Sequence, residues 1–249
     1  MIVKEYKEIG IVGMPPLELI RELNANGTVI HDLDTPMIKA DIELTAPYLP
    51  RVYCAILRTV VLNGLHLKLD AIYIDVGPGK CDCALHVATV LEDMLAIPIY
   101  RTKNEDTSSF GTPISHSRMG LLQKFERITE GVKNTEKPSK PPEPCNPTAG
   151  FWGVPPRDFS ILNLFPDTTH VYGWARCMEN KAPDNLEIEL YVNPEIPTVF
   201  FAQSFCQKSM LAKYLAHKYN GLFVDVDAQL DDSTRAKVIA FLTLRGAIN

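Results

Sequence analysis

Several signatures of common protein classes are missing from this sequence. No apolar run reaches the roughly 18 residues that a membrane-spanning helix needs, which argues against a membrane protein. There is no C-x-x-C pair and no H-x-x-x-H or H-E-x-x-H pattern, so a zinc ribbon or a zinc protease is disfavoured. A P-loop and a G-x-S-x-G nucleophile elbow are also absent. The chain therefore belongs to none of these easily recognised classes.

An excess of positive charge is also lacking. The net charge is −5, and no long Lys/Arg stripe occurs, so we expect no nucleic-acid partner. The first eight residues carry four charges and no apolar h-region, which predicts no secretory signal and a cytoplasmic location. The chain has 249 residues, 46% of them hydrophobic, so it is long enough and apolar enough to bury a large core.

The positions of the cysteines are the most informative feature of this chain. In a reducing compartment, six cysteines are more typical of metal ligands, redox groups or buried core residues than of disulfides. At least three of them closely follow runs that are typical of buried strands. Loops that follow parallel strands gather at one edge of a sheet, so these thiols are expected to meet there. The cysteines are Cys54, Cys81, Cys83, Cys145, Cys177 and Cys206.

The clearest local unit spans residues 69–100. A continuous apolar run at 69–76 predicts a strand of the doubly buried, parallel kind. The glycines at 77 and 79 end it, and a helix over about 84–95 and a strand at 97–100 follow. Cys81 and Cys83 therefore lie at the entrance of the helix.

A similar unit occurs in the second half. It consists of a strand at 197–202, a loop at 203–206, a helix at 207–219 and a strand at 222–226. Cys206 is placed before its helix as Cys81 is before the first. Together, the two units predict an α/β fold with two small Rossmann-like lobes, mainly parallel sheets and a cleft between the lobes.

Five prolines concentrate between residues 133 and 147, which is typical of a semi-rigid linker. We therefore expect an N-terminal lobe at 1–132 and a C-terminal lobe at 148–249. The glycine-, proline- and aromatic-rich stretch at 150–156 is expected to be a loop, packed on its own domain or over the cleft as a lid. Further predictions are a strand at 186–192, a helix starting near residue 50 with Cys54 in its first turns, and a final helix at 231–244 capped by Asp232 or Ser233.

Five of the cysteines are candidate metal ligands. A thiolate at a helix N-terminus is stabilised by the macrodipole and by free amides, which applies to Cys81, Cys83 and Cys206. Cys177 stands beside Arg176, which lowers a thiol pKa. For each of these, and for Cys54, the alternative is a plain buried thiol, because free cysteine is among the most buried residue types.

Candidate ligand-binding residues other than cysteine lie in two loops. Gly77 and Gly79 allow a ligand to approach the backbone closely. Ser109 and Arg118 belong to a polar loop that offers hydroxyls and a guanidinium to a phosphate or carboxylate. The alternative for that loop is a solvated turn before a helix. No residue stands out as a catalytic acid or base.

The N-terminal part resembles the 2-hydroxyacyl-CoA dehydratase and benzoyl-CoA reductase subunit family. The similar stretches are residues 9–19, Tyr53-Cys54 with the helix after it, and residues 70–82 with the strand at 97–100. The resemblance implies that Cys54 and Cys81 ligate a [4Fe–4S] cluster between α/β domains. It also implies a small acyl thioester of coenzyme A as substrate and an electron-donor protein as partner. The third ligand stays open between Cys206 and Cys177, since no stretch of the second half matches the family.

Three functional hypotheses follow. The first is an iron–sulfur protein with redox or dehydratase-type chemistry in the interlobe cleft, a lyase or oxidoreductase that acts as a homo- or heterodimer. A second is a carrier or maturation protein for a metal or metallocofactor, without turnover. The third is a metal-free protein that binds a small anion at the helix N-termini near Cys83 and Cys206.

Overall fold

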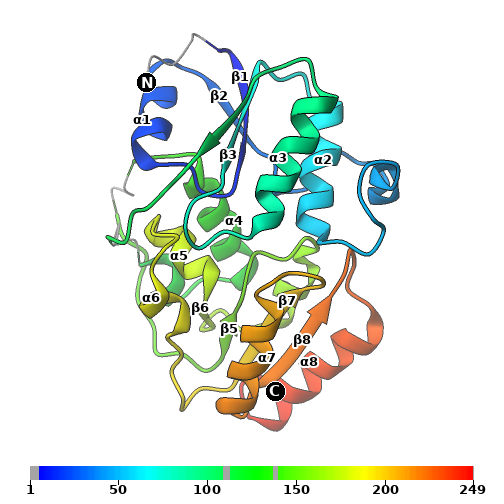
Figure 1. The fold of residues 1–249 in the computed structure, drawn as a ribbon. Helices are drawn as coiled ribbons and strands as arrows, with labels where there is room; N and C mark the ends of the chain where they lie inside the picture. Colours follow the sequence, from blue (N-terminus) through cyan, green and yellow to red (C-terminus); the bar gives the residue numbers. More distant parts are fainter. Residues whose placement is uncertain (1–5, 109–112, 137–139, 249) are drawn as a thin grey trace.

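The protein has an α/β fold with two four-stranded, all-parallel sheets flanked by helices, as predicted (Figure 1). The computed structural model describes residues 6–108, 113–136 and 140–248. The strand order is β2-β1-β3-β4 in the first sheet and β6-β5-β7-β8 in the second. We refer to the two sheets with their helices as the first and second lobes. No helix among the described residues is both long and apolar enough to cross a bilayer.

The elements of the first lobe alternate between strand and helix along the chain. They are β1 (Glu8–Val12), α1 (Leu17–Ala25), β2 (Val29–Asp32), η1 (Ile42–Thr45), α2 (Ala55–His66), β3 (Ala71–Asp75), α3 (Asp82–Met94) and β4 (Ile99–Thr102).

The second lobe repeats this alternation. Its elements are η2 (Ile114–His116), α4 (Leu121–Val132), β5 (Gly150–Trp152), η3 (Phe159–Leu164), β6 (His170–Tyr172), α5 (Trp174–Asn180), α6 (Leu186–Leu190), β7 (Thr198–Gln203), α7 (Ser209–Lys218), β8 (Leu222–Val226) and α8 (Asp232–Leu244).

Strand β3 is buried along its whole length because both faces of the first sheet are covered. Ile72 and Ile74 pack in a cluster with α2 and α3, while Tyr73 joins a different cluster with α1. Side chains alternate between the two faces of a strand, so a continuous apolar run is what such a position requires.

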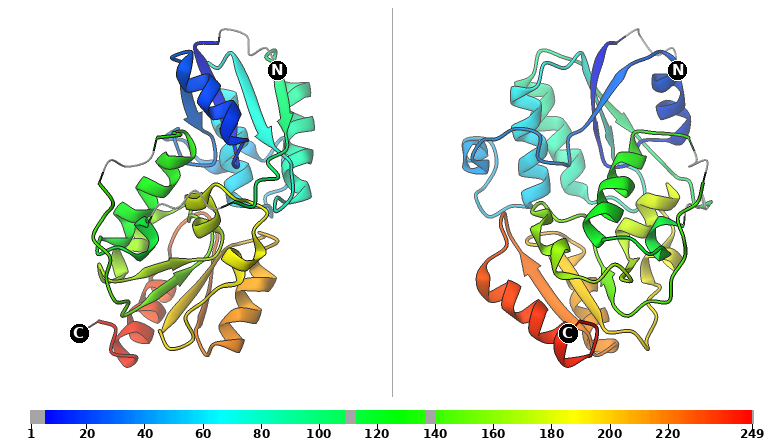
Figure 2. Two further views of the ribbon diagram at one scale, coloured as in Figure 1. Left: turned by 90° about the vertical axis from the view of Figure 1, so that its left-hand side faces the viewer. Right: turned by 180° about the vertical axis from the view of Figure 1, so that it is seen from behind.

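Strand β7 has the same role in the second sheet. Phe200 and Ala202 pack against α7, and Val199 and Phe201 pack on the opposite face with α4 and α8. Figure 2 shows the helices on both sides of the two sheets. The run at 69–76 was therefore correctly interpreted as a doubly buried strand, and the strand predicted at 197–202 is doubly buried as well.

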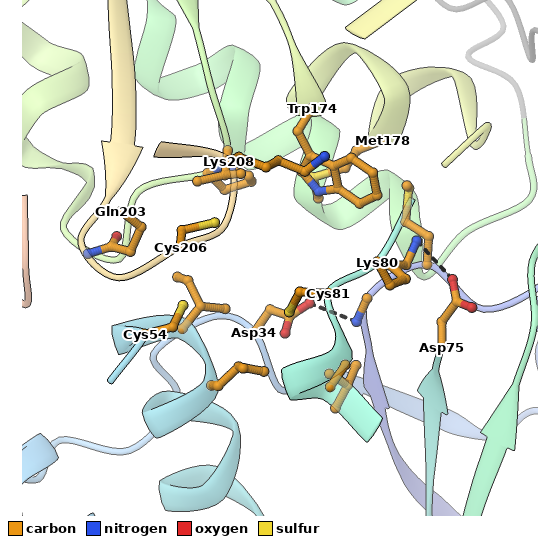
Figure 3. A pocket seen from close by; sticks show the side chains of 18 of the residues that line it. Asp34, Cys54, Asp75, Lys80, Cys81, Trp174, Met178, Gln203, Cys206 and Lys208 are labelled. Carbon is orange, nitrogen blue, oxygen red and sulfur yellow. Dashed lines mark hydrogen bonds and ion pairs between the residues drawn. The ribbon is translucent and has the colours of Figure 1, made fainter. Parts of the chain in front are cut away.

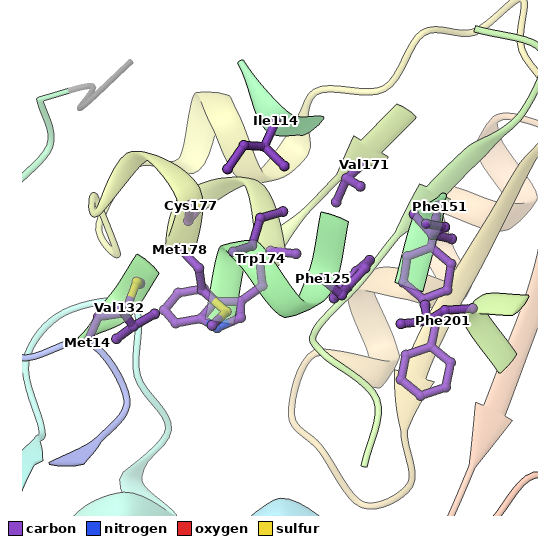
Figure 4. Packing of buried hydrophobic residues seen from close by; sticks show 14 of the residues in the cluster. Met14, Ile114, Phe125, Val132, Phe151, Val171, Trp174, Cys177, Met178 and Phe201 are labelled. Carbon is purple, nitrogen blue, oxygen red and sulfur yellow. The ribbon is translucent and has the colours of Figure 1, made fainter. Parts of the chain in front are cut away.

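The apolar packing continues from one lobe to the other. Met14 of the first lobe belongs to the same buried cluster as Val132, Trp174 and Met178, and these side chains lie close together in Figure 4. Helix α4 packs mainly against α5 and η3. Of the predicted linker, residues 137–139 lie outside the described residues, and Pro144 forms an antiparallel bridge with Ser117.

Two sequence predictions of secondary structure were wrong. Part of the expected loop at 150–156 is strand β5, which pairs with both β6 and β7 in the middle of the second sheet. It was missed because only three residues form the strand. The expected strand at 186–192 contains helix α6, since the Asn185 side chain accepts a hydrogen bond from the backbone of Ile188 and starts a helical turn.

Two predicted helix starts are also shifted. Cys54 precedes α2 as its N-cap and does not lie within the first turns. Helix α8 is capped by Asp231, whose carboxylate accepts from the backbone of Thr234, and not by Asp232 or Ser233. The shift at α2 has a consequence for Cys54, because it places this residue at the N-terminus of the helix, next to the free backbone amides of the first turn.

Candidate functional site

A cavity of about 140 Å³ lies between the two lobes. It is lined by residues that follow β1, β2 and β3 of the first lobe and β5, β6 and β7 of the second. Ligands of parallel α/β sheets bind outside the carboxyl ends of the strands, so the position is the expected one. A cavity of roughly 150 Å³ is large enough to bind benzene, which sets the scale for a ligand here.

Three cysteines line this cavity (Figure 3); two of them are helix N-caps, and the third lies in the turn before a helix. Cys54 is the N-cap of α2, and Cys81 is the N-cap of α3. Cys206 lies three residues before α7, in a turn in which its carbonyl accepts a hydrogen bond of 3.0 Å from the Ser209 amide. Two different lobes and three separate loops therefore bring thiols to one place.

Burial and the backbone amides of the helices have opposite effects on the pKa values of these thiols. Burial raises the pKa of Cys54 to about 12 and that of Cys81 to about 11, and nearby thiols, Cys206 among them, add to both shifts. Burial also raises the pKa of Cys206. Backbone amides act in the opposite direction, for example those of Ile56 and Leu57 on Cys54. The metal-free site therefore holds neutral thiols, which a bound metal would deprotonate.

The other cysteines do not line the cavity. Burial and the neighbouring Cys83 thiol raise the pKa of Tyr53. Cys177 is fully buried, and its Sγ lies 3.7 Å from the Asn185 carbonyl. Cys145 belongs to the second lobe, with its Sγ 3.9 Å from His170 Nε2. Of the two candidates for a third ligand, only Cys206 faces the cavity with Cys54 and Cys81.

In the described part of the chain, no group of three or more His, Cys, Asp or Glu side chains is arranged to hold a single metal ion. A cubane cluster does not require its ligands to surround a single ion, because each of its thiolates binds a different iron. The donor set of Cys54, Cys81 and Cys206 consists of thiols alone and is accompanied by helix amides. That is the chemistry with which proteins hold iron–sulfur clusters.

Two lysines also enter the cavity, one beside each of two thiols. Lys80 directly precedes Cys81, and its Nζ lies 2.9 Å from the buried Asp75 Oδ2. Lys208 follows Cys206 by two residues and forms an ion pair with the buried Glu189. The two ammonium groups lie 4.6 and 4.4 Å from the centroid of one indole ring, that of Trp174.

Two carboxyl groups complete the polar lining. Asp34 accepts a hydrogen bond of 2.8 Å from the Gly13 amide, and burial raises its pKa to about 6. Burial and the neighbouring Asp34 also raise the pKa of Asp32. Both carboxyl groups therefore bind protons more tightly than an exposed aspartate does.

The other predicted binding residues have different positions. Gly79 lines the cavity, with a positive φ of 77°. Gly77 does not line it and packs instead against the backbone of Asn104. Arg118 is exposed and pairs with Asp167 over 3.5 Å on the surface. Ser109 lies outside the described residues, so the anion site predicted for this loop stays a prediction.

Lys80, Lys208 and Trp174 were missed by the sequence analysis. Lys80 and Lys208 had a local signal, since each lies within two residues of a cysteine at a helix entrance. Trp174 follows β6 and Gly173, which adopts a positive φ of 74°, at the same edge of the second sheet. The strand-end argument that selected the cysteines applies equally to these three residues.

Comparison with known proteins yields no assignment: no protein-family model matches the chain, and no curated protein matches it.

Proposed function

We propose that this chain is an iron–sulfur protein that holds a [4Fe–4S] cluster through Cys54, Cys81 and Cys206. The observation that carries the proposal is the convergence of these three thiols, from three helix entrances, on one interlobe cavity. A cluster held by three protein thiolates has one iron open to substrate, and it supplies redox or Lewis-acid chemistry there.

The charges around the cavity favour such a group. Three thiolates around an iron–sulfur core give an anionic centre, and Lys80 and Lys208, each paired with one buried carboxylate, bring ammonium groups to the same cavity. The backbone amides at the starts of α2 and α3 act to lower the pKa of Cys54 and of Cys81 and so favour their thiolate forms. Both effects act on this chain's own residues and are present before any metal binds.

The remaining lining restricts water. Val154, Pro155, Phe159 and Met178 form an apolar wall from the second lobe, and Val12 and Leu57 add apolar groups from the first. An apolar wall lowers the local dielectric constant and strengthens each charge interaction inside the cavity.

The resemblance of residues 9–19, 53–54 and 70–82 to the dehydratase family suggests the reaction type. On that basis we propose reductive or dehydratase-type chemistry on a small acyl thioester, with an electron-donor protein as partner. A homo- or heterodimer in the cytoplasm is part of the same proposal.

The ligand assignment is tested with alanine variants. Cys54→Ala, Cys81→Ala and Cys206→Ala are reconstituted without oxygen and analysed for iron and sulfide per chain. Each is expected to lose most of its cluster. Cys145→Ala is the matched control, because Cys145 is a half-buried thiol outside the cavity, and it is expected to retain wild-type iron. Full iron and full visible absorbance in both Cys54→Ala and Cys81→Ala would refute the assignment.

A further inference from the structure

We propose that the cavity also binds the carboxylate of a small apolar organic acid, held by Lys80 and Lys208 beside Trp174. This names a ligand class for the same cavity and rests on the proposed function in so far as the acid would lie next to the cluster. Figure 3 shows the three side chains together at one side of the cavity.

Lys80 has donors that the protein does not use. Its side chain is only 8% exposed, and an ammonium group has three N–H donors. In the described part of the chain, Asp75 is its ion-pair partner at 2.9 Å, and Nζ has no further hydrogen-bond acceptor. A buried donor without an acceptor is costly, so a ligand oxygen at this position would be stabilised.

Lys208 supplies the second cation from the other lobe. Its side chain is 15% exposed, and Glu189 holds it from the protein side without lining the cavity. Lys80 and Lys208 approach the same indole ring, and the Lys208 charge is near enough to add to the effect of burial in lowering the pKa of Lys80. Two neighbouring ammonium groups attract an anion and repel a cation.

The other walls select what is attached to the anion. Val154, Pro155, Phe159 and Met178 offer only apolar side chains to a ligand. Phosphate carries four oxygens, and some of them would face this wall without hydrogen-bond partners, at a desolvation cost. A carboxylate with a short hydrocarbon chain satisfies both the ammonium groups and the wall.

Binding is tested by titrating the full-length protein with butyrate and following tryptophan fluorescence, in the metal-free and the reconstituted forms. The matched probes are butyramide, which has the same shape without charge, and inorganic phosphate. Trp174→Phe identifies the source of the signal, because Trp152 is fully buried elsewhere. We expect saturable butyrate binding and affinities for both other probes that are lower by about tenfold or more.

Variants test the two cations separately. Lys208→Gln is expected to weaken butyrate binding by about tenfold or more, the effect of a lost charge-assisted hydrogen bond. Lys80→Gln alone would leave Asp75 buried and unpaired, so Asp75→Asn/Lys80→Gln is used, with the same expectation. Lys213→Gln, on the exposed side of α7, is the control and should bind as the wild type does.

The outcomes separate this inference from the proposed function. Saturable butyrate binding by a protein that takes up no iron or sulfide on anaerobic reconstitution would overturn the iron–sulfur proposal and leave the carboxylate site intact. A cluster in a protein that shows no saturable butyrate response in either form would overturn the carboxylate site alone. Equal affinity for butyrate and butyramide, or wild-type affinity in Lys208→Gln, would overturn it as well.

Discussion

Arg157 donates a hydrogen bond from Nε to Thr59 Oγ1 over 3.0 Å and so connects the second lobe to helix α2 of the first. The same arginine donates from Nη1 to the Ala228 carbonyl, and its amide donates to Gln203 Oε1. It lies next to the Pro155-Pro156 segment that lines the cavity. The position of that wall relative to the first lobe therefore depends in part on one hydroxyl group of α2.

Thr59→Val removes this hydroxyl and retains the shape of the side chain. We expect the free energy of unfolding to fall by about 1–2 kcal/mol, because the Arg157 Nε–H loses its acceptor in a partly buried position. Urea denaturation measures the change. Thr129→Val is the control, since Thr129 is also buried and donates to the carbonyl four residues earlier but has no such contact with Arg157. Equal losses in the two variants would contradict the interlobe role.

Gly79 makes the second close approach between the lobes. A Cβ at this position would lie 2.1 Å from the Pro183 carbonyl oxygen, in a backbone with φ of 77°. Gly27 has a similar φ of 69° but nothing within 4 Å of such a Cβ. Alanine at either position incurs the left-handed penalty of about 1–2 kcal/mol. Only Gly79→Ala also has the steric clash.

Thermal unfolding of the two alanine variants therefore isolates the clash. We expect Gly79→Ala to lose at least about 2 kcal/mol more than Gly27→Ala, because backbone must move to make room. Identical melting temperatures would mean that the approach of the 183–184 segment to Gly79 is not maintained in solution.

The sheets and two of the cavity thiols, Cys81 and Cys206, were placed from the sequence for one physical reason, whereas Cys54 was selected through the family resemblance. Continuous apolar runs such as 69–76 and 197–202 are required in doubly buried strands, and the cysteines at the following helix entrances must share the strand ends. Strand β5 escaped this argument because three residues carry no periodicity. Its burial depends on pairing with β6 and β7, which lie 20 or more residues away.

Lys80, Lys208 and Trp174 illustrate a second limit of prediction from the sequence. Lysine is usually exposed, so nothing in the local pattern predicts that Lys80 is buried. Its burial depends on Asp75, five residues earlier at the end of β3, and on Trp174, almost a hundred residues later. The arrangement of Lys80, Asp75 and Trp174 therefore forms only after both lobes have folded.

Asp34 is expected to make stability depend on pH. Burial raises its pKa in the folded protein to about 6, above the unfolded value of 3.8. Between these values the folded state binds more protons, so the free energy of unfolding falls as pH rises from about 4 to 6. Asp34→Asn removes this term, and we expect it to be more stable than wild type at pH 7 by on the order of 2 kcal/mol.

Urea denaturation at a series of pH values measures the difference between the two proteins. Asp231→Asn is a control with the opposite sign. Hydrogen bonds from the Thr234 backbone and side chain lower the Asp231 pKa, so its contribution is lost as pH falls. A difference between wild type and Asp34→Asn that does not change from pH 4 to 7 would contradict the raised pKa.

The cavity thiols are expected to be chemically inert in the metal-free protein. With pKa values of about 12 and 11, Cys54 and Cys81 hold little thiolate at pH 8. Alkylation by iodoacetamide should be at least about a hundredfold slower than for a free cysteine, because the thiolate is the reacting form. Peptide mass spectrometry over time measures each site. Rapid modification of either thiol in the folded protein would contradict its burial.

The most direct test of the central claim is the iron and sulfide content of the wild-type chain, purified and reconstituted without oxygen. The account predicts about four irons and four sulfides per chain, with the broad visible absorbance of a cubane cluster. Exchangeable metal well below one per chain would instead indicate a carrier. A colourless protein without iron or sulfide after reconstitution would contradict the proposal that Cys54, Cys81 and Cys206 bind a cluster.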